Sequence, residues 1–218
     1  MNAGQADEMR AVLFDYDDTL VDTRRCKYAA LKHLAQHHYG MALTDRRIDA
    51  HWGIAYRQLF FELFRDVDPD LERVIHRYEE LDSAFPITAF ADTARVLDAL
   101  LQRCLVGIVT AAGRTLVESQ LHQLQLPVAR LSLLQTAEDT PYHKPDPRVF
   151  DPALARLRQL GVSLGRLTYV GDSLKDFMAA RDAGLSFFGV LRGTSSREEF
   201  AAAGARTVGS LDELLARL

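Results

Sequence analysis

Short runs of apolar residues alternate with amphipathic segments along most of this chain. Five apolar runs have the length of buried strands, namely residues 11–14, 105–109, 131–134, 167–170 and 187–191. Between them, apolar residues recur at three- and four-residue spacing, which predicts helices over residues 93–102, 115–124, 147–160 and 173–183. Strands that alternate with helices of this length predict an α/β fold with a parallel sheet covered on both faces.

One interval is too long for this pattern. Asp15 and Thr110 are 95 residues apart, whereas the steps from Thr110 to Lys144 and from Lys144 to Asp172 take 34 and 28. Because a strand–helix–strand step needs about 30 residues, the first step carries an insertion of roughly 65. We therefore predict a discontinuous core domain and a small inserted helical domain that acts as a lid. The expected ranges are 1–20 and 87–218 for the core, 21–86 for the insertion, and 24–39, 45–64 and 69–81 for its helical segments.

The first apolar run ends in an acidic cluster, in the sequence RAVLFDYDDTL. Residues i and i+2 of a strand point the same way, so Asp15 and Asp17 should present two carboxylates together. A protein keeps such a pair when a cation neutralises it, or when one carboxylate attacks and the other carries a proton. On this segment alone, a polar turn after a strand is an equally good interpretation.

Polar groups also follow three later strands, where ligands of open α/β sheets bind. They are the Thr110 hydroxyl with the backbone N–H groups of Ala111 and Ala112, Lys144 in HKPDP, and Asp172 and Asp176 in GDSLKD. Each alone is typical of an ordinary turn or loop. Together they provide oxygen ligands for Mg²⁺ and donors for phosphate oxygens, so the set indicates a magnesium ion and a phosphoryl group.

Composition and net charge argue against some classes of binding partner. The 218 residues are 48% hydrophobic and 26% charged, with a net charge of −4 and a pI near 6.0. This balance gives no general attraction to nucleic acid or to an anionic membrane surface. Residues 1–10 lack the apolar stretch of a signal peptide, which favours the cytoplasm. We expect a monomer or homodimer.

With these motifs in place, the chain resembles the haloacid dehalogenase superfamily, in its phosphoglycolate phosphatase and β-phosphoglucomutase-like branch. The four motifs of that family correspond to DYDDT at residues 15–19, Thr110, Lys144 and GDSLKD at residues 171–176. The resemblance covers essentially the whole chain. It implies a Rossmann-like three-layer α/β core with an inserted α-helical cap.

The resemblance also implies a role for each motif residue. Asp15 would be the nucleophile that forms an aspartyl-phosphate, and Asp17 the general acid and base. The implied phosphate-binding residues are Thr110, Ala111 and Lys144. The implied Mg²⁺ ligands are Asp15, the backbone carbonyl of Asp17, and Asp172, with Asp176 nearby or coordinating through water.

These roles predict a Mg²⁺-dependent phosphatase that hydrolyses a small phosphorylated metabolite. Asp17 favours phosphate esters, because the dehalogenase and phosphonate-cleaving branches lack an aspartate at this position. A phosphomutase of the β-phosphoglucomutase type is an alternative, and a non-catalytic regulator that keeps the fold is another. Two positions depart from the family pattern: Asp18 stands where glycine is usual, and Ala111 where asparagine is frequent.

The predicted cap contains one candidate specificity segment, HWGIAYRQLF at residues 51–60. Its Gly53 and Arg57 are similar to the substrate-facing cap segment of the same branch. In this interpretation Arg57 anchors a substrate anion, and Trp52 or Tyr56 closes over it. The alternative is a cap helix whose aromatic residues are core and whose arginine is solvated.

Overall fold

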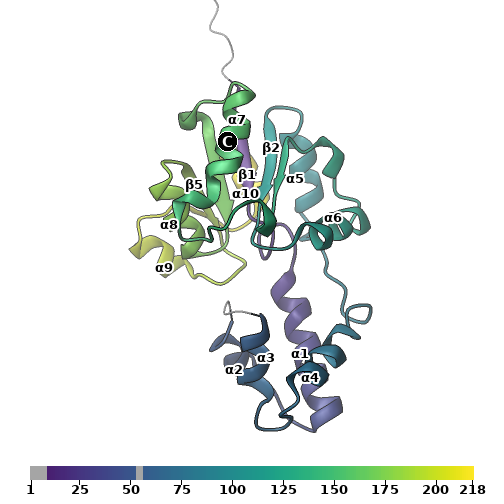
Figure 1. Ribbon diagram of the computed structural model, residues 1–218. Helices are drawn as coiled ribbons and strands as arrows, with labels where there is room; N and C mark the ends of the chain where they lie inside the picture. Colours follow the sequence, from purple (N-terminus) through teal and green to yellow (C-terminus); the bar gives the residue numbers. More distant parts are fainter. Residues whose placement is uncertain (1–8, 53–55) are drawn as a thin grey trace, which may run out of the picture. The chain divides into compact units, whose positions relative to one another are not determined.

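The computed structural model describes residues 9–52 and 56–218, and its core is a six-stranded, all-parallel sheet. The strand order is β3-β2-β1-β4-β5-β6, with β1 at the centre (Figure 1). The strands are β1 (Ala11–Phe14), β2 (Leu105–Val109), β3 (Leu133–Gln135), β4 (Leu167–Gly171), β5 (Ser186–Val190) and β6 (Thr207–Val208). This arrangement confirms the predicted Rossmann-like α/β fold.

The predicted strands agree with the observed ones most closely in the buried centre of the sheet. The bounds of β1 and β2 are those expected, and the four residues of β1 are all buried. The third strand begins two residues later than predicted, because Val128–Arg130 forms a short 3₁₀ turn and Leu131 only closes it. The two-residue strand β6 was not predicted, since so short a segment carries no periodicity.

Helices connect the strands and cover the sheet. They are α5 (Thr93–Leu100), α6 (Arg114–Gln123), α7 (Asp151–Gln159), α8 (Leu174–Asp182), α9 (Arg197–Ala202) and α10 (Leu211–Arg217). The helix predicted over 147–160 begins instead as a 3₁₀ segment, Pro147–Phe150, which passes into α7. The Asp146 side chain accepts a hydrogen bond from the Arg148 N–H, and this cap fixes the tight first turn.

Side chains of β1 alternate between the two faces of the sheet, as a buried parallel strand requires. Ala11 and Leu13 pack in a cluster with residues of α7 and α8, including Leu154 and Phe177. This cluster reaches the strand ends, where it supports the polar groups described below.

Residues Thr23–Thr88 form a second compact unit, separate from the core unit that ends at Asp22 and resumes at Ala89. Its helices are α1 (Thr23–Tyr39), α2 (Asp45–Asp49), α3 (Tyr56–Phe64) and α4 (Leu71–Glu79). Apolar side chains from these helices, such as Leu34, Phe60 and Val74, make its own hydrophobic core. We call this unit the cap.

The predicted helical segment over residues 45–64 contains two helices, α2 and α3. Helix α2 ends at Asp49, and His51 and Trp52 donate their N–H groups to carbonyls three residues earlier, at Ile48 and Asp49. These tighter turns stop the regular helical ladder before α3 begins. Gly53, in the same segment, lies outside the described residues.

The chain leaves and re-enters the core through one small tertiary element. Val21 pairs with Ala89 in an antiparallel bridge, and the Thr93 hydroxyl donates to the Leu20 carbonyl at 2.8 Å. These two contacts connect residues 89–93, where the chain re-enters the core, to the loop that follows β1. Across the described part of the chain, no helix combines the length and apolar character required to cross a bilayer.

Candidate active site

The loop after β1 folds into a tight turn that carries the acidic motif. Leu20 and Val21 donate their N–H groups to the Tyr16 carbonyl at 2.9 and 3.2 Å. Asp18 adopts a φ of 54°, in the left-handed region that favours glycine and tolerates aspartate. The backbone therefore explains the unusual residue: position 18 needs a positive φ, and its aspartate is buried within the turn.

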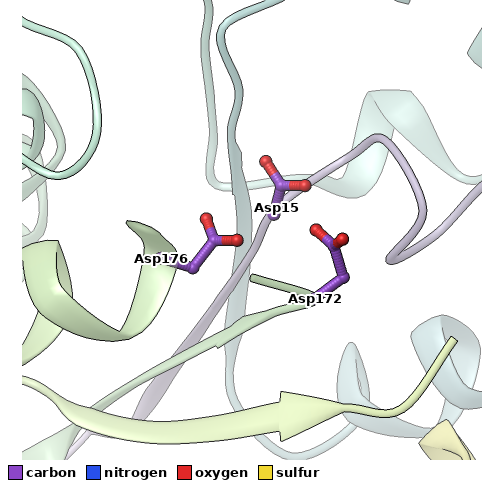
Figure 2. A group of neighbouring side chains, drawn as sticks. All are labelled: Asp15, Asp172 and Asp176. Atoms are coloured by element: carbon purple, nitrogen blue, oxygen red, sulfur yellow. The ribbon is translucent and has the colours of Figure 1, made fainter. Parts of the chain in front are cut away.

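Three carboxylates meet at the ends of β1 and β4. Asp15 follows β1, Asp172 follows β4, and Asp176 lies in the first turn of α8. One oxygen of each lies within 4.8 Å of the others, and all three residues are buried. Figure 2 shows the three side chains pointing toward one another. Asp17 is half-buried and is not a member of this group, although its charge acts on Asp15.

Crowding changes the acidity of these groups. Burial, together with the charges of Asp176, Asp172 and Asp17, raises the pKa of Asp15 well above its usual range, and Lys144 only partly opposes this. Burial and the Asp176 charge raise the pKa of Asp172 to about 6. The ionised cluster is therefore unfavourable by itself and would be stabilised by a bound cation.

Lys144 provides one internal cation for this cluster. It lies in the loop before α7, joined to Pro145 by a cis peptide bond, and its side chain is 12% exposed. Its ammonium donates to Asp15 Oδ1 at 2.5 Å and to Asp176 Oδ1 at 2.7 Å. Burial by itself lowers the pKa of Lys144, but the two carboxylates outweigh burial and hold it well above its ordinary value. The ammonium stays charged at neutral pH.

Thr110 follows β2 directly and is 5% exposed. Its N–H donates to the Gln135 carbonyl at the end of β3, which fixes the backbone there. Its hydroxyl oxygen accepts a hydrogen bond from the Ala112 N–H at 3.1 Å. The expectation of a free N–H at Ala112 is therefore wrong, and Ala111 is the residue of this turn whose N–H we retain as a candidate phosphate donor.

Two glycines allow backbone and side chains to approach closely around the acidic group. A Cβ at Gly171 would overlap the side chain of Asp176, and a Cβ at Gly193 would overlap the carboxylate of Asp172. Ser173 and Asp176 also form a capping box at the start of α8, which orients Asp176. Gly171 is the first residue of the motif GDSLKD, so the sequence already indicated a glycine at this position.

The loop after β5 was not predicted to contribute. The Thr194 N–H donates to Asp172 Oδ2 at 2.8 Å, and its hydroxyl lies 3.2 Å from the same oxygen. These bonds hold one oxygen of Asp172 in place. Residues 192–195 read RGTS, which is typical of any surface turn, so no local signal could have identified them.

The candidate specificity residues of the cap have different surroundings. Trp52 contacts the ring of Tyr28 edge-on, with centroids 4.8 Å apart, and packs on the hydrophobic core of the cap. Tyr56 is 46% exposed. The Arg57 guanidinium pairs with both oxygens of Glu72 on α4 and remains largely exposed.

The core thus places buried carboxylates, the Lys144 ammonium and the Thr110 hydroxyl at the strand ends of one parallel α/β sheet. The chain belongs to the haloacid dehalogenase-like hydrolase family, which residues 12–190 match. This confirms the resemblance inferred from the four motifs. The chain is a hydrolase of that family.

Individual relatives agree with this assignment. Pyrophosphatase PpaX from Bacillus pumilus is 27% identical over 187 residues, which cover 84% of this chain and 83% of that protein. N-acetylmuramic acid 6-phosphate phosphatase from Pseudomonas putida is 29% identical over 184 residues, covering 81% and 80%. A solved structure from Geobacter sulfurreducens, titled as a haloacid dehalogenase superfamily hydrolase of subfamily IA, has a TM-score of 0.73 at 21% identity and covers 98% of each chain. That structure supports the fold alone.

Proposed function

We propose that this protein is a Mg²⁺-dependent phosphatase that hydrolyses small phosphorylated metabolites through an aspartyl-phosphate on Asp15. The observation that carries the proposal is the buried group of Asp15, Asp172 and Asp176 with the Lys144 ammonium between two of them. Relatives named for the hydrolysis of pyrophosphate and of a sugar phosphate support the same class of substrate.

The donor set fits magnesium. Carboxylate oxygens are the ligands that this hard cation prefers, and three of them converge within 4.8 Å. We assign Asp15 and Asp172 as direct ligands, together with the backbone carbonyl of Asp17. Both oxygens of Asp176 already accept hydrogen bonds from protein groups, which supports a role through water. When bound, the ion would neutralise the carboxylates and polarise a phosphoryl oxygen.

In the first step, a carboxylate oxygen of Asp15 attacks the phosphorus of the substrate. The bond from phosphorus to the leaving oxygen breaks, and Asp17 gives its proton to that oxygen. Lys144, the Thr110 hydroxyl and the Ala111 N–H donate to the phosphoryl oxygens and stabilise their charge. The products of this step are the alcohol and an aspartyl-phosphate.

In the second step, a water molecule attacks the phosphorus of the aspartyl-phosphate. Asp17, now ionised, takes the proton of this water, and the bond between phosphorus and Asp15 breaks. Inorganic phosphate leaves and both aspartates return to their starting states. One residue acts first as acid and then as base, so its position next to Asp15 in the same turn is an essential part of the proposal.

We place substrate selection in the cap. Tyr56 and Arg57 offer an exposed aromatic ring and an exposed guanidinium, which suit a polar, anionic leaving group. Trp52 would act indirectly, through its packing on the cap core. The pairing of Arg57 with Glu72 means that a substrate anion must compete with that carboxylate.

The test begins with hydrolysis of p-nitrophenyl phosphate by purified protein, with Mg²⁺ and with EDTA. We expect activity that needs the metal. A panel of pyrophosphate, phosphoglycolate, nucleotides and sugar phosphates, including N-acetylmuramic acid 6-phosphate, then identifies the substrate class. Release of inorganic phosphate from sugar phosphates separates hydrolysis from transfer of the phosphate within the sugar.

The covalent intermediate has its own measurement. Acid quenching during turnover, followed by borohydride reduction, converts an acyl phosphate at Asp15 into homoserine, which peptide mass spectrometry detects. Asp15→Asn protein is the matched control and should yield no modified peptide. Rapid turnover without any modification at residue 15, or activity unchanged by EDTA, would refute the mechanism.

A further inference from the structure

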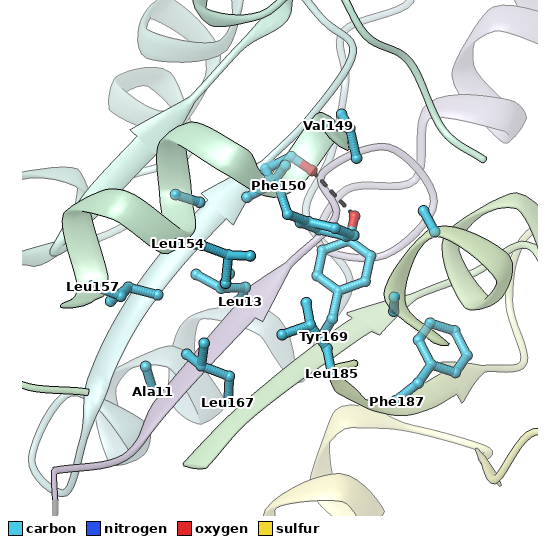
Figure 3. Close-up of a cluster of buried hydrophobic side chains, with 14 of the residues drawn as sticks. Ala11, Leu13, Val149, Phe150, Leu154, Leu157, Leu167, Tyr169, Leu185 and Phe187 are labelled. Atoms are coloured by element: carbon cyan, nitrogen blue, oxygen red, sulfur yellow. Dashed lines mark hydrogen bonds between the residues drawn. The ribbon is translucent and has the colours of Figure 1, made fainter. Parts of the chain in front are cut away.

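Tyr169 is a residue of β4 that the four motifs do not include. It is completely buried, and its ring packs edge-on against Phe150 at 4.7 Å and beside Phe187 at 6.3 Å. Figure 3 shows this ring within the apolar cluster, with a hydrogen bond from its hydroxyl to a backbone carbonyl. The apolar ring therefore carries one polar atom to the carboxylate group.

That hydroxyl has three polar neighbours. Lys144 Nζ lies at 2.9 Å, Asp176 Oδ1 at 3.2 Å and the Val109 carbonyl at 3.2 Å. A phenol has one hydrogen to donate, and its oxygen can accept. The hydroxyl thus accepts from the ammonium and donates either to Asp176 or to the carbonyl that precedes Thr110.

The geometry at Lys144 accounts for all three of its hydrogens. The ammonium donates to Asp15 Oδ1, to Asp176 Oδ1 and to Tyr169 Oη, at 2.5, 2.7 and 2.9 Å. An ammonium has three donors and no acceptor, so these bonds define its orientation in the substrate-free protein. A phosphoryl oxygen would take over the hydrogen that points to Asp15 once that residue is phosphorylated. Of the three acceptors, the tyrosine is the only one that carries no formal charge.

This difference matters during turnover. Asp15 loses its negative charge when it becomes an acyl phosphate, and Asp176 lies beside the magnesium position. Tyr169 takes part in neither step, so it stays uncharged, and its buried ring on β4 holds the hydroxyl beside the ammonium. We propose that Tyr169 is a positioning residue that holds the Lys144 ammonium in place while the charge on Asp15 changes. This inference rests on the proposed phosphatase function.

A spectroscopic experiment tests the anchor without any turnover. Lys27, Lys32, Lys144 and Lys175 are the four lysines of the chain, and the Lys144 side chain is only 12% exposed. In metal-free protein labelled with ¹⁵N-lysine, we expect one ammonium signal that exchanges slowly with water. Lys144→Met should remove this signal and so assign it.

Tyr169→Phe keeps the ring and deletes the hydroxyl. We expect the exchange of the Lys144 ammonium to become at least about tenfold faster, as one hydrogen bond to a charged group is lost. The matched control is Tyr39→Phe in the cap, whose hydroxyl also bridges an aspartate and an arginine, Asp68 at 3.0 Å and Arg77 at 3.2 Å. That variant should leave the signal unchanged.

Kinetics provide the second readout. We expect kcat of Tyr169→Phe to fall about tenfold while the Mg²⁺ concentration for half-maximal activity changes less than about twofold. In a Lys144→Met background, adding Tyr169→Phe should change kcat by less than about twofold, since the tyrosine acts through the lysine. This double-mutant comparison remains decisive if Tyr169→Phe lowers stability.

The possible failures are distinguishable. Wild-type protein that hydrolyses no phosphate ester would refute the proposed function itself. An active wild type whose Lys144 exchange and kcat are the same in Tyr169→Phe would refute the inference alone. An equal tenfold loss of kcat in both backgrounds would also refute it, because the tyrosine would then act independently of Lys144.

Discussion

The core and the cap each contain an ion pair between a basic side chain and a carboxylate, but in opposite environments. In the core, Lys144 and Asp15 have side chains that are 12% and 8% exposed. In the cap, Arg57 and Glu72 are 59% and 72% exposed. A buried pair fixes geometry at a high desolvation cost, whereas water screens an exposed pair and leaves it adjustable.

The two environments also change acidity in opposite directions. Burial raises the pKa of Asp15 despite its lysine, whereas the hydrogen bond from Arg57 lowers the pKa of Glu72. The core therefore holds carboxylates that disfavour their own charge, which a cation can relieve. The cap holds a carboxylate that already has its partner.

Asp15→Asn should eliminate turnover, because the amide cannot form the aspartyl-phosphate. It should not lower the thermal midpoint of metal-free protein, since it removes one of three crowded carboxylates. Phosphate release and thermal unfolding measure the two effects. Turnover comparable to wild type would exclude Asp15 as the nucleophile.

Asp17→Asn should slow turnover by about 10²–10⁴-fold, the usual contribution of general acid–base catalysis. The decrease should be smaller for p-nitrophenyl phosphate than for an alkyl phosphate, because nitrophenolate leaves without needing a proton. Steady-state rates on both substrates test this. Equal rates in variant and wild type would contradict the role of Asp17.

Acid should weaken magnesium binding. The pKa of Asp172 is about 6 in the metal-free fold, above its usual 3.8, so a proton must leave before the metal binds below that pH. We expect apparent Mg²⁺ affinity to fall up to about tenfold between pH 6 and pH 5, for one displaced proton. Titrations of metal-induced thermal stabilisation measure this, and an affinity independent of pH would contradict it.

The raised pKa of Asp172 weakens metal binding at low pH, but it stabilises the metal-free fold at low pH. The folded state holds the proton of Asp172 more tightly than the unfolded state does. This group therefore favours the fold at pH values below its unfolded pKa, and that contribution is lost as the pH rises toward 6. Thermal midpoints of Asp172→Asn and wild type in EDTA should converge at low pH and separate as the pH rises.

Arg57→Ala should have the smallest effect. The rate on p-nitrophenyl phosphate should change less than about twofold, and the thermal midpoint should stay close to that of wild type, because the pair with Glu72 is solvated. Relative rates across the metabolite panel should change more. Arg65→Ala, which removes another exposed cap arginine, is the control, and identical substrate profiles in all three proteins would remove Arg57 from specificity.

Sequence patterns predicted the centre of the core well. The bounds of β1 and β2 were correct because all of β1 and all but the first residue of β2 are buried, and both runs end at polar residues. The acidic residues at positions 15, 172 and 176 were predicted to meet, and the carboxyl ends of parallel strands do bring them together. In these places the end of an apolar run in the sequence is also the end of a buried strand, where the site residues lie.

Other features depend on tertiary contacts that leave no local pattern. Tyr169 reads as one more apolar residue of a strand, and only the tertiary structure brings Lys144, Asp176 and the Val109 carbonyl to its hydroxyl. Thr194 meets Asp172 because β5 lies beside β4. In the cap, the helical spacing of apolar residues continues past Ala50 in the sequence, although helix α2 ends at Asp49.

The bridge between Val21 and Ala89 brings together the two points at which the inserted segment leaves and re-enters the core. Residues paired across antiparallel strands lie about 5 Å apart, so both ends of the inserted segment leave the core at a single point. The inserted segment is therefore closed by the core in the way that the two strands of a hairpin close a loop. The entropic cost of closing such a loop grows only slowly with the number of residues in it. The core can therefore accept inserted segments of different length at this one point and keep its own fold.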